Sequence, residues 1–399
     1  MNIEITPNAS KLIESLRYLT YTNETAIADI VDNSFDAGAD EVKIAIDKEK
    51  GITIIDDGFG MDLDTMKQAI RLGSNTEKDH TDLGRFGMGL VTAGISMGRC
   101  IEVISKADGG EANKVVLDLD DIAATDEWRA SQEELTEDEK KWFSKQNHAT
   151  VVSVKKLDSI KQNIGSAAAK HLRRVFRGFL MAGKTITVNS EKLTPIDPLA
   201  RDADDTEILY DDDIEINNTK VHIVVAHLDT DKSELSSKRE DLDRIAINTT
   251  NQGFYVMRNS REIAAAETLG LYERHPSKNR FRCEISYTGN LDKEFGINFT
   301  KNKINMSQAL ADKIMAQVGP LITMIGKQGV RDSQVNKSDE ISHDDAEGII
   351  KRKKALLRTK TNWNESHKKP TPKPKPDDPK NVDQDETKKH HKRVNVKHI

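Results

Sequence analysis

The feature that most constrains this chain is a helix with three carboxylates and an amide on one face. Residues 24–38 predict a helix closed by Gly38, and its polar side chains at i, i+3, i+4 and i+7 are Asp29, Asp32, Asn33 and Asp36. Apolar side chains occupy much of the rest of the helix and can pack on a sheet. Three carboxylates in one stripe repel one another unless a cation or a ligand compensates them. The stripe indicates a binding site, and a solvated helix face is an equal alternative.

A second element places a carboxylate in a glycine-rich turn. The segments 41–47 and 51–56 predict strands, and the second strand leads into Asp56-Asp57-Gly58-Phe59-Gly60-Met61. An ionised carboxylate only accepts hydrogen bonds, so Asp56 suits the exocyclic amine of adenine. The glycines let the backbone approach a flat ligand or adopt a positive φ. Asp-Asp-Gly also occurs in ordinary turns and calcium loops, although the alternating ligands of a calcium loop are missing.

A third element predicts a phosphate site. The run Asp82-Leu83-Gly84-Arg85-Phe86-Gly87-Met88-Gly89-Leu90 opens a predicted helix through Met97. Closely spaced glycines before a helix expose backbone N–H groups at the positive end of its dipole, which suits phosphate. The run is not a Walker loop, since no Gly-Lys-Ser/Thr follows. It is not a dinucleotide fingerprint either, since no strand leads straight into it.

In this order the three elements resemble the N box and the two glycine boxes of the GHKL (Bergerat-fold) ATPase superfamily. The similarity is closest to MORC proteins and their bacterial relatives. It rests on Ile-Ala-Asp-Ile-Val-Asp-Asn-Ser at 27–34, Leu-Gly-Ser-Asn-Thr at 72–76 and the run at 82–90. Weaker similarity to the second domain of gyrase B and MutL lies in segments 175–177, 187–189, 195–198, 253–259 and 300–301. The resemblance covers roughly residues 5–305.

The resemblance implies roles for single residues. Asn33 would bind a Mg²⁺ ion that bridges the phosphates, and Asp56 would hold the adenine amine. Asp29 would be the general base that orients water, and Lys301 would reach the γ-phosphate from the second domain. Residues 73–86 would form a lid. The other residues expected to bind the nucleotide are Asp36, Gly58, Gly60, Met61, Ser74, Thr76, Gly84, Arg85, Phe86, Gly87, Met88 and Gly89.

Two positions depart from the family pattern. The base is usually Glu, and Asp29 is one methylene shorter, so slow turnover is expected because catalysis depends on sub-ångström placement. Glu24 lies on a different helical face and is a poor substitute. Val91 stands where the MORC pattern often has Lys, so one phosphate-side cation is lost or is supplied by Arg85 or Lys78.

Strands and helices mix without a regular βαβ alternation, which predicts an α+β fold. We expect a Bergerat-type ATP-binding sandwich, a mixed sheet covered by helices, at residues 1–158. A transducer-like α+β domain is expected at 159–330, with a long helix at 165–181, strands near 184–189, 220–228, 253–258, 281–289 and 295–300, and a helix at 306–326. Helix 165–181 carries a basic face made of Lys170, Arg173, Arg174 and Arg177. A solvated or acid-paired face is favoured over contact with nucleic acid.

The charge is distributed unevenly along the 399 residues. From residue 351 onward there are 16 Lys and Arg against 6 Asp and Glu, whereas residues 1–350 have 44 against 60. Residues 370–379 hold five of the ten prolines, so we expect 331–399 to be a basic, largely disordered tail. Such a tail seeks a polyanion such as DNA, or folds back on the acidic body. The two cysteines form no metal spacing and favour a reducing, cytoplasmic compartment. No segment approaches the ~20 apolar residues of a membrane helix.

Several functions remain open on this basis. The first is a slow Mg²⁺-dependent ATPase that dimerises or closes as a clamp on ATP, in a DNA-associated maintenance or defence process. The second is a non-hydrolysing, ATP-gated protein-interaction module. A chaperone-like ATPase is a third, although the chain lacks a large client-binding region.

Overall fold

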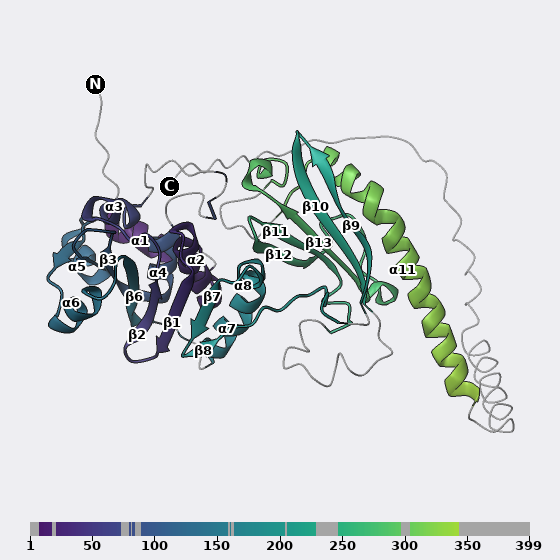
Figure 1. The fold of residues 1–399 in the computed structure, drawn as a ribbon, viewed down its shortest axis with the longest axis horizontal. Coiled ribbons are helices and arrows are strands. Elements are labelled where there is room, and N and C mark those ends of the chain that lie inside the picture. The colour runs from purple at the N-terminus through teal and green to yellow at the C-terminus, as the bar shows by residue number, and fades with distance from the viewer. Residues whose placement is uncertain are drawn as a thin grey trace, which may run out of the picture. The chain divides into compact units, whose positions relative to one another are not determined.

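The computed structural model contains two β-sheets, each covered by helices (Figure 1). It describes residues 8–17, 21–72, 80, 82–83, 89–158, 160, 163–203, 206–228, 246–296 and 304–342, with side chains described as far as 334. The described residues as far as 334 form one compact unit. In the described part of the chain, no helix combines the length and the hydrophobicity that a membrane span needs. Both cysteines are buried free thiols.

The first sheet has eight strands in the order β5-β4-β3-β6-β2-β1-β7-β8. Strands β1 and β7 are parallel, and the other pairs are antiparallel. Its strands are β1 (Glu41–Asp47), β2 (Gly51–Asp56), β3 (Gly98–Lys106), β4 (Asn113–Asp118), β5 (Ser131–Glu133), β6 (Ala149–Leu157), β7 (Thr185–Val188) and β8 (Glu191–Lys192).

Helices pack on this sheet through one apolar cluster, in which α2 and α4 lie against each other and α2 also contacts α7. The nearly continuous apolar sequence of α4 suits this position, because every residue from Leu90 to Ile95 is buried. The helices of this part are α1 (Ala9–Arg17), α2 (Asn23–Asp36), α3 (Leu63–Ala69), α4 (Gly89–Met97), α5 (Leu119–Thr125), α6 (Glu137–Phe143), α7 (Ile164–Val175) and α8 (Arg177–Met181).

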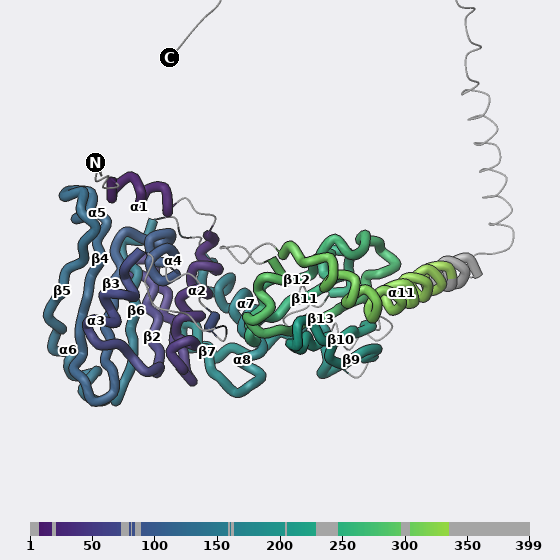
Figure 2. Tube along the Cα trace, turned by 90° about the horizontal axis from the view of Figure 1, so that it is seen from above, coloured from purple at the N-terminus to yellow at the C-terminus, as the bar shows by residue number. Residues whose placement is uncertain are grey.

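The second sheet has five strands in the order β12-β11-β13-β10-β9, which can be followed along the trace in Figure 2. Strands β11 and β13 are parallel, and the other pairs are antiparallel. Helix α11 buries Leu310, Ile314, Val318 and Ile322 against this sheet, at the spacing of a helical stripe. The elements are β9 (Thr206–Ile216), β10 (Thr219–Leu228), β11 (Gly253–Arg258), β12 (Arg261–Glu267), β13 (Phe281–Tyr287), the short 3₁₀ helices η1 (Pro276–Lys278) and η2 (Gly289–Leu291), and α11 (Gln308–Ser342).

The predicted α+β architecture is confirmed, and the strands predicted at 41–47 and 51–56 have the predicted bounds. Three details differ. The strand expected near 184–189 in the second domain is β7, which pairs with β1 in the first sheet, so that sheet extends beyond residue 158. The helix expected at 165–181 is interrupted at Phe176, whose φ of −101° and ψ of 20° leave the helical region. Helix α11 continues to Ser342, into the segment expected to be tail.

Other expectations can be placed only in part. Of the strand expected at 295–300, Phe295 and Gly296 form a turn, and the remainder lies outside the described residues. The same holds for residues 343–399, so the disordered tail stays a prediction. Strand β9 was not predicted, because its run of Asp211, Asp212 and Asp213 resembles a loop. An edge strand tolerates such exposed charges.

Candidate functional site: the acidic helix face and the turn after β2

The acidic face of α2 is compensated from a distant part of the chain. Thr22 caps the helix through a reciprocal bond with Thr25, and the buried side packs in the first core. The Arg261 guanidinium, at the start of β12, lies 2.5 Å from Asp32 Oδ1 through Nε and 3.3 Å from Asp29 Oδ1 through Nη2. Asp32 and Arg261 are both buried. The stripe is therefore neither a solvated face nor an uncompensated one.

The proposed base Asp29 is also held from the other side. The Tyr21 hydroxyl donates to Asp29 Oδ2 at 2.8 Å. Burial and the Asp29 carboxylate raise the pKa of Tyr21, so the phenol keeps its proton at neutral pH and acts as a donor. Both carboxylate oxygens of Asp29 thus accept a bond, and each oxygen retains a lone pair for a further donor.

Asn33 has an amide nitrogen that is not satisfied within the described part of the chain. Its Nδ2 atom is buried and has no hydrogen-bond partner among the described residues. A buried unsatisfied amide costs about 1–3 kcal/mol, so it indicates a missing partner. The amide can rotate to present its oxygen, a hard ligand that suits Mg²⁺. No cluster of three or more His, Cys, Asp or Glu side chains with metal-binding geometry occurs among the residues that the structure describes. An ion bound at Asn33 would need further ligands, such as the oxygens of nucleotide phosphates.

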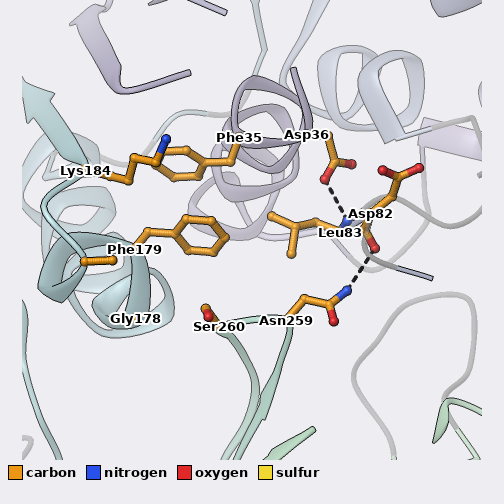
Figure 3. A pocket seen from close by; sticks show the side chains of 10 residues that line it. Phe35, Asp36, Asp82, Leu83, Gly178, Phe179, Lys184, Asn259 and Ser260 are labelled. Atoms are coloured by element: carbon orange, nitrogen blue, oxygen red, sulfur yellow. Dashed lines mark hydrogen bonds between the residues drawn. The ribbon is translucent and has the colours of Figure 1, made fainter. Parts of the chain in front are cut away.

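Asp36 connects α2 to the start of the glycine-rich run, because Leu83 N–H donates to Asp36 Oδ1 at 2.7 Å. Beside this contact lies a pocket of about 420 Å³, lined by the stacked rings of Phe35 and Phe179 (Figure 3). Asn259, from the turn between β11 and β12, donates through Nδ2 to the Asp82 carbonyl of the same peptide group at 3.4 Å. Asp82, in the segment predicted to form the lid, therefore contacts the turn between β11 and β12 of the second sheet.

Asp56 ends β2 in a buried polar site, with its side chain only 5% exposed. The Ser34 hydroxyl donates to Asp56 Oδ2 at 2.9 Å, and Gly58 N–H donates to Oδ1 at 3.0 Å. Burial raises the pKa of Asp56 from 3.8 to about 6, although both of these bonds favour the charged form. At pH 7 the group is mainly an acceptor, as the adenine prediction requires.

The turn after Asp56 depends on its glycines. Gly60 has a φ of +68°, and a Cβ there would lie 1.8 Å from the Lys106 carbonyl oxygen. A Cβ at Gly58 would meet the Ala37 carbonyl oxygen at 2.8 Å. The Asp57 carboxylate accepts the N–H groups of Asp40 and Glu41, both at 2.8 Å, and so fixes the turn to β1. Backbone therefore packs closely around the position that the adenine prediction assigns.

The sequence analysis missed several polar neighbours of this turn. Met61 N–H donates to Ser105 Oγ at 2.8 Å, and the hydroxyls of Ser105 and Thr150 lie 2.8 Å apart. Thr150 is directly opposite Asp56 in the pairing of β2 with β6. His148 Nδ1 contacts the Gly58 carbonyl at 2.7 Å. The serine and threonine lie in strand-like runs without local signals, and only sheet register brings them to the site.

Much of the predicted phosphate loop and lid cannot be placed. Ser74, Thr76, Lys78, Gly84, Arg85, Phe86, Gly87, Met88 and Lys301 lie outside the described residues. Gly89 opens α4, and a Cβ built there would meet no atom within 4 Å among the described residues outside its chain neighbours and its own helix backbone. Val91 is fully buried and supplies no cation, as expected of valine.

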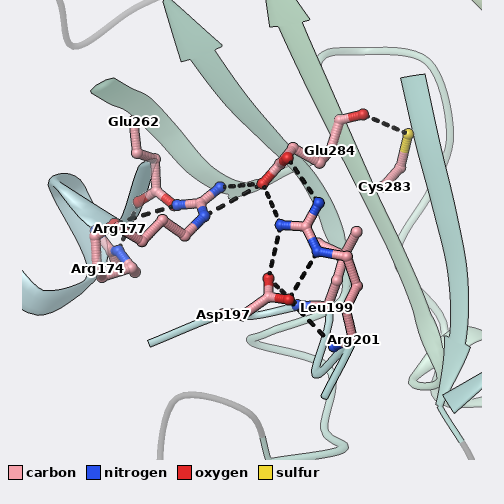
Figure 4. Close-up of polar contacts among 8 residues, drawn as sticks. All are labelled: Arg174, Arg177, Asp197, Leu199, Arg201, Glu262, Cys283 and Glu284. Carbon is pink, nitrogen blue, oxygen red and sulfur yellow. Dashed lines mark hydrogen bonds and ion pairs between the residues drawn. The ribbon is translucent and has the colours of Figure 1, made fainter. Parts of the chain in front are cut away.

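A second buried ion-pair network lies around Arg177, the first residue of α8 (Figure 4). Arg177 is 1% exposed and contacts Glu262 of β12 and Glu284 of β13. Arg201 links Asp197 to the same Glu284. Arg174 also pairs with Glu262. The acid-paired face that was expected for helix 165–181 is confirmed at Arg174 and Arg177.

A family model described as "Histidine kinase-, DNA gyrase B-, and HSP90-like ATPase" matches residues 21–150. This segment contains α2, β2, the turn at 57–60 and the first two residues of the opposite strand β6, Ala149 and Thr150. Residues 21–150 belong to the GHKL ATPase superfamily. The predicted recognition is confirmed for this segment, which we call the GHKL domain.

Three curated proteins are similar in sequence to part of this chain. ATPase morc-1 of Caenorhabditis elegans is 34% identical over 88 residues, which are 21% of this chain and 10% of that protein. Protein MICRORCHIDIA 3 and Protein MICRORCHIDIA 2, both of Arabidopsis thaliana, are 31% identical over 100 residues and 29% over 124. These matches cover 23% and 27% of this chain, and 17% and 20% of the plant proteins. The chain thus matches a fifth or less of the length of each relative, and it is MORC-like within the matched region.

Proposed function

We propose that the chain binds ATP together with Mg²⁺ at the face formed by α2 and the turn after β2, and hydrolyses it slowly. The observation that carries this proposal is the buried Asp56 carboxylate at the end of β2, in a turn with no room for side chains at Gly58 and Gly60. The superfamily membership of residues 21–150 and the similarity to ATPase morc-1 of Caenorhabditis elegans support it.

In this proposal Asp56 accepts a hydrogen bond from the adenine amine. The Asn33 side chain, whose Nδ2 has no partner among the described residues, faces the phosphates. Bound Mg²⁺ would neutralise phosphate charge, with Asn33 as its protein ligand. Asp29 orients the attacking water, and Gly84–Gly89 wrap the phosphates with Arg85, Phe86, Gly87 and Met88. Ser74 and Thr76 belong to the lid, and Lys301 reaches the γ-phosphate.

Calorimetry with a non-hydrolysable Mg²⁺–ATP analogue tests the nucleotide assignment. Asp56→Asn should weaken binding by about 100-fold or more, because a donor then faces the adenine amine and buried polar groups lose partners. Asp57→Asn is the matched control, since its amide oxygen can still accept the two bonds from Asp40 and Glu41. Unchanged affinity in Asp56→Asn would refute the adenine site.

We further propose that ATP drives dimerisation or clamp closure. A switch between mostly open and mostly closed populations needs about 5 kcal/mol of differential binding. One contact from Lys301 cannot supply this, so the lid and a second protomer must add to it. Light scattering of the apo, ADP and analogue states should give a larger mass or a more compact shape only with the analogue, and Lys301→Ala should weaken that response. The same mass and shape in all three states would refute the gate.

A non-hydrolysing, ATP-gated interaction module is the second candidate. It is favoured by Asp29 in place of the usual glutamate base, because a side chain shorter by one methylene positions water less well. Single-turnover measurement of phosphate release distinguishes the two candidates.

We propose DNA as the partner of the basic tail, residues 331–399, on the basis of its charge. Truncation after Arg331 should lower DNA affinity and its salt dependence. Equal binding by both forms at every salt concentration would refute this role.

A further inference from the structure

One tight turn of the second sheet contacts two regions of the proposed ATP site, the acidic face of α2 and the segment before the glycine-rich loop. Strand β11 ends at Arg258 and β12 begins at Arg261, and these two residues pair across the hairpin. The connecting residues Asn259 and Ser260 have φ values of +47° and +66°, as in a two-residue hairpin turn. Such a turn fixes the positions of the side chains on either side of it. We call residues 258–261 the hairpin turn.

One end of the hairpin turn holds the acidic helix face. Arg261 binds Asp32 and Asp29 through different nitrogens, and its guanidinium lies 5.7 Å from the centre of the Phe176 ring. Planar fork geometry allows arginine to serve two carboxylates together, which a lysine ammonium does less well. With Tyr21 on the other oxygen, the Asp29 carboxylate is fixed from two directions.

The other end holds the segment before the glycine-rich loop. Arg258 Nη1 donates to the Asp82 carbonyl at 2.7 Å, and Asn259 Nδ2 donates to the His80 carbonyl at 2.9 Å. Arg258 is itself held by Asp292, through bonds of 2.7 and 2.9 Å. The hairpin turn therefore bonds to the backbone on the N-terminal side of the loop and to the carboxylate proposed as the base.

We propose that Arg261 is a positioning residue for ATP hydrolysis, which sets the Asp29 carboxylate and makes turnover depend on the second sheet. The inference rests on the proposed ATPase function. Asp29 has a shorter reach than glutamate, so its orientation must be set closely. Its two bonds leave lone pairs free to accept a proton from water. This link from the second sheet is separate from the one predicted at Lys301.

The test compares Arg261→Lys with Arg177→Lys in the full-length chain. Both arginines are buried, and both connect the second sheet to a helix that packs on the first sheet. Arg261 contacts α2, whereas Arg177 of α8 contacts Glu262 and Glu284 and has no described contact with α2. Arg261→Lys should lower kcat by about 10- to 100-fold, the effect of misplacing a reacting group by about 1 Å. Analogue affinity and KM should stay near wild type, since Arg261 acts through Asp29 and is not proposed to contact the nucleotide. Arg177→Lys should keep kcat near wild type.

Thermal melting establishes that the variants are folded. Tyr21→Phe provides a second variant, because it removes the other bond to Asp29 and should also lower kcat without changing analogue affinity. Equal kcat losses in Arg261→Lys and Arg177→Lys, or an unchanged kcat in both Arg261→Lys and Tyr21→Phe, would overturn the positioning role alone. A wild-type protein that fails to bind the analogue would overturn the proposed function itself. One that binds the analogue without turnover would overturn hydrolysis and positioning but keep the nucleotide site.

Discussion

Asp56 and Asp29 are both carboxylates of the GHKL domain, yet different parts of the chain hold them. Asp56 takes its bonds from Ser34 and Gly58, within 22 residues along the sequence. Asp29 takes one bond from Tyr21, and another from Arg261, which is 232 residues away. The proposed adenine end is therefore complete within the first sheet and its helices, whereas the proposed catalytic end needs the second sheet.

This difference predicts that nucleotide binding and nucleotide hydrolysis depend on different parts of the chain. An adenine end built from local contacts should bind nucleotide whatever the second sheet does. A base held by Arg261 should act only while the hairpin turn stays in contact with α2. Substitutions at the two ends should therefore fall into two classes, one that changes affinity and one that changes turnover.

The largest expected effect is at the catalytic end. Asp29→Asn should lower kcat by about 10²- to 10⁴-fold, because the amide cannot accept a proton from water. Analogue affinity should stay close to wild type. Glu24→Gln, on another face of the same helix, is the control and should turn over normally. Loss of analogue binding in Asp29→Asn would show that the catalytic end also determines affinity, which would contradict the comparison.

The adenine end should be sensitive to backbone geometry. Gly60→Ala should lower the free energy of unfolding by about 3 kcal/mol or more, since it combines a positive φ with a clash against Lys106. Gly89→Ala should leave stability unchanged or raise it, because nothing lies near its Cβ and alanine favours a helix. Chemical denaturation measures both. Equal stability of Gly60→Ala and the wild type would show that the turn is not rigid.

The buried charge of Asp56 predicts a smaller, pH-dependent effect. Its pKa rises from 3.8 to about 6 on folding, so the folded state binds this proton more tightly than the unfolded chain. The unfolding free energy should then fall as the pH rises from about 4 to 7, by roughly 2–3 kcal/mol for this group alone. The stability difference between wild type and Asp56→Asn, measured by urea denaturation, should favour wild type more at pH 4 than at pH 7. Parallel pH curves would contradict the buried charge.

Local patterns were enough to predict the helix, the strands and the turn that form the proposed adenine end. The apolar periodicity of α2, the alternation in β1 and β2 and the glycines after Asp56 act within a few residues, so their structure follows from short-range preferences. The pairing of Thr150 with Asp56 and the contact of Arg261 with Asp29 depend on sheet register and on the packing of the hairpin turn. No local signal marks them, and the break at Phe176 between α7 and α8 likewise follows from tertiary packing.

The central claim is that the proposed catalytic end of the site is connected to the second sheet through the hairpin turn. Backbone hydrogen exchange of residues 253–267 in the presence of ADP or a non-hydrolysable ATP analogue, each with Mg²⁺, measures this connection. The account predicts slower exchange in this segment with the analogue than with ADP, and loss of that difference in Arg261→Lys. The same exchange with both nucleotides, at saturating binding of each, would contradict it.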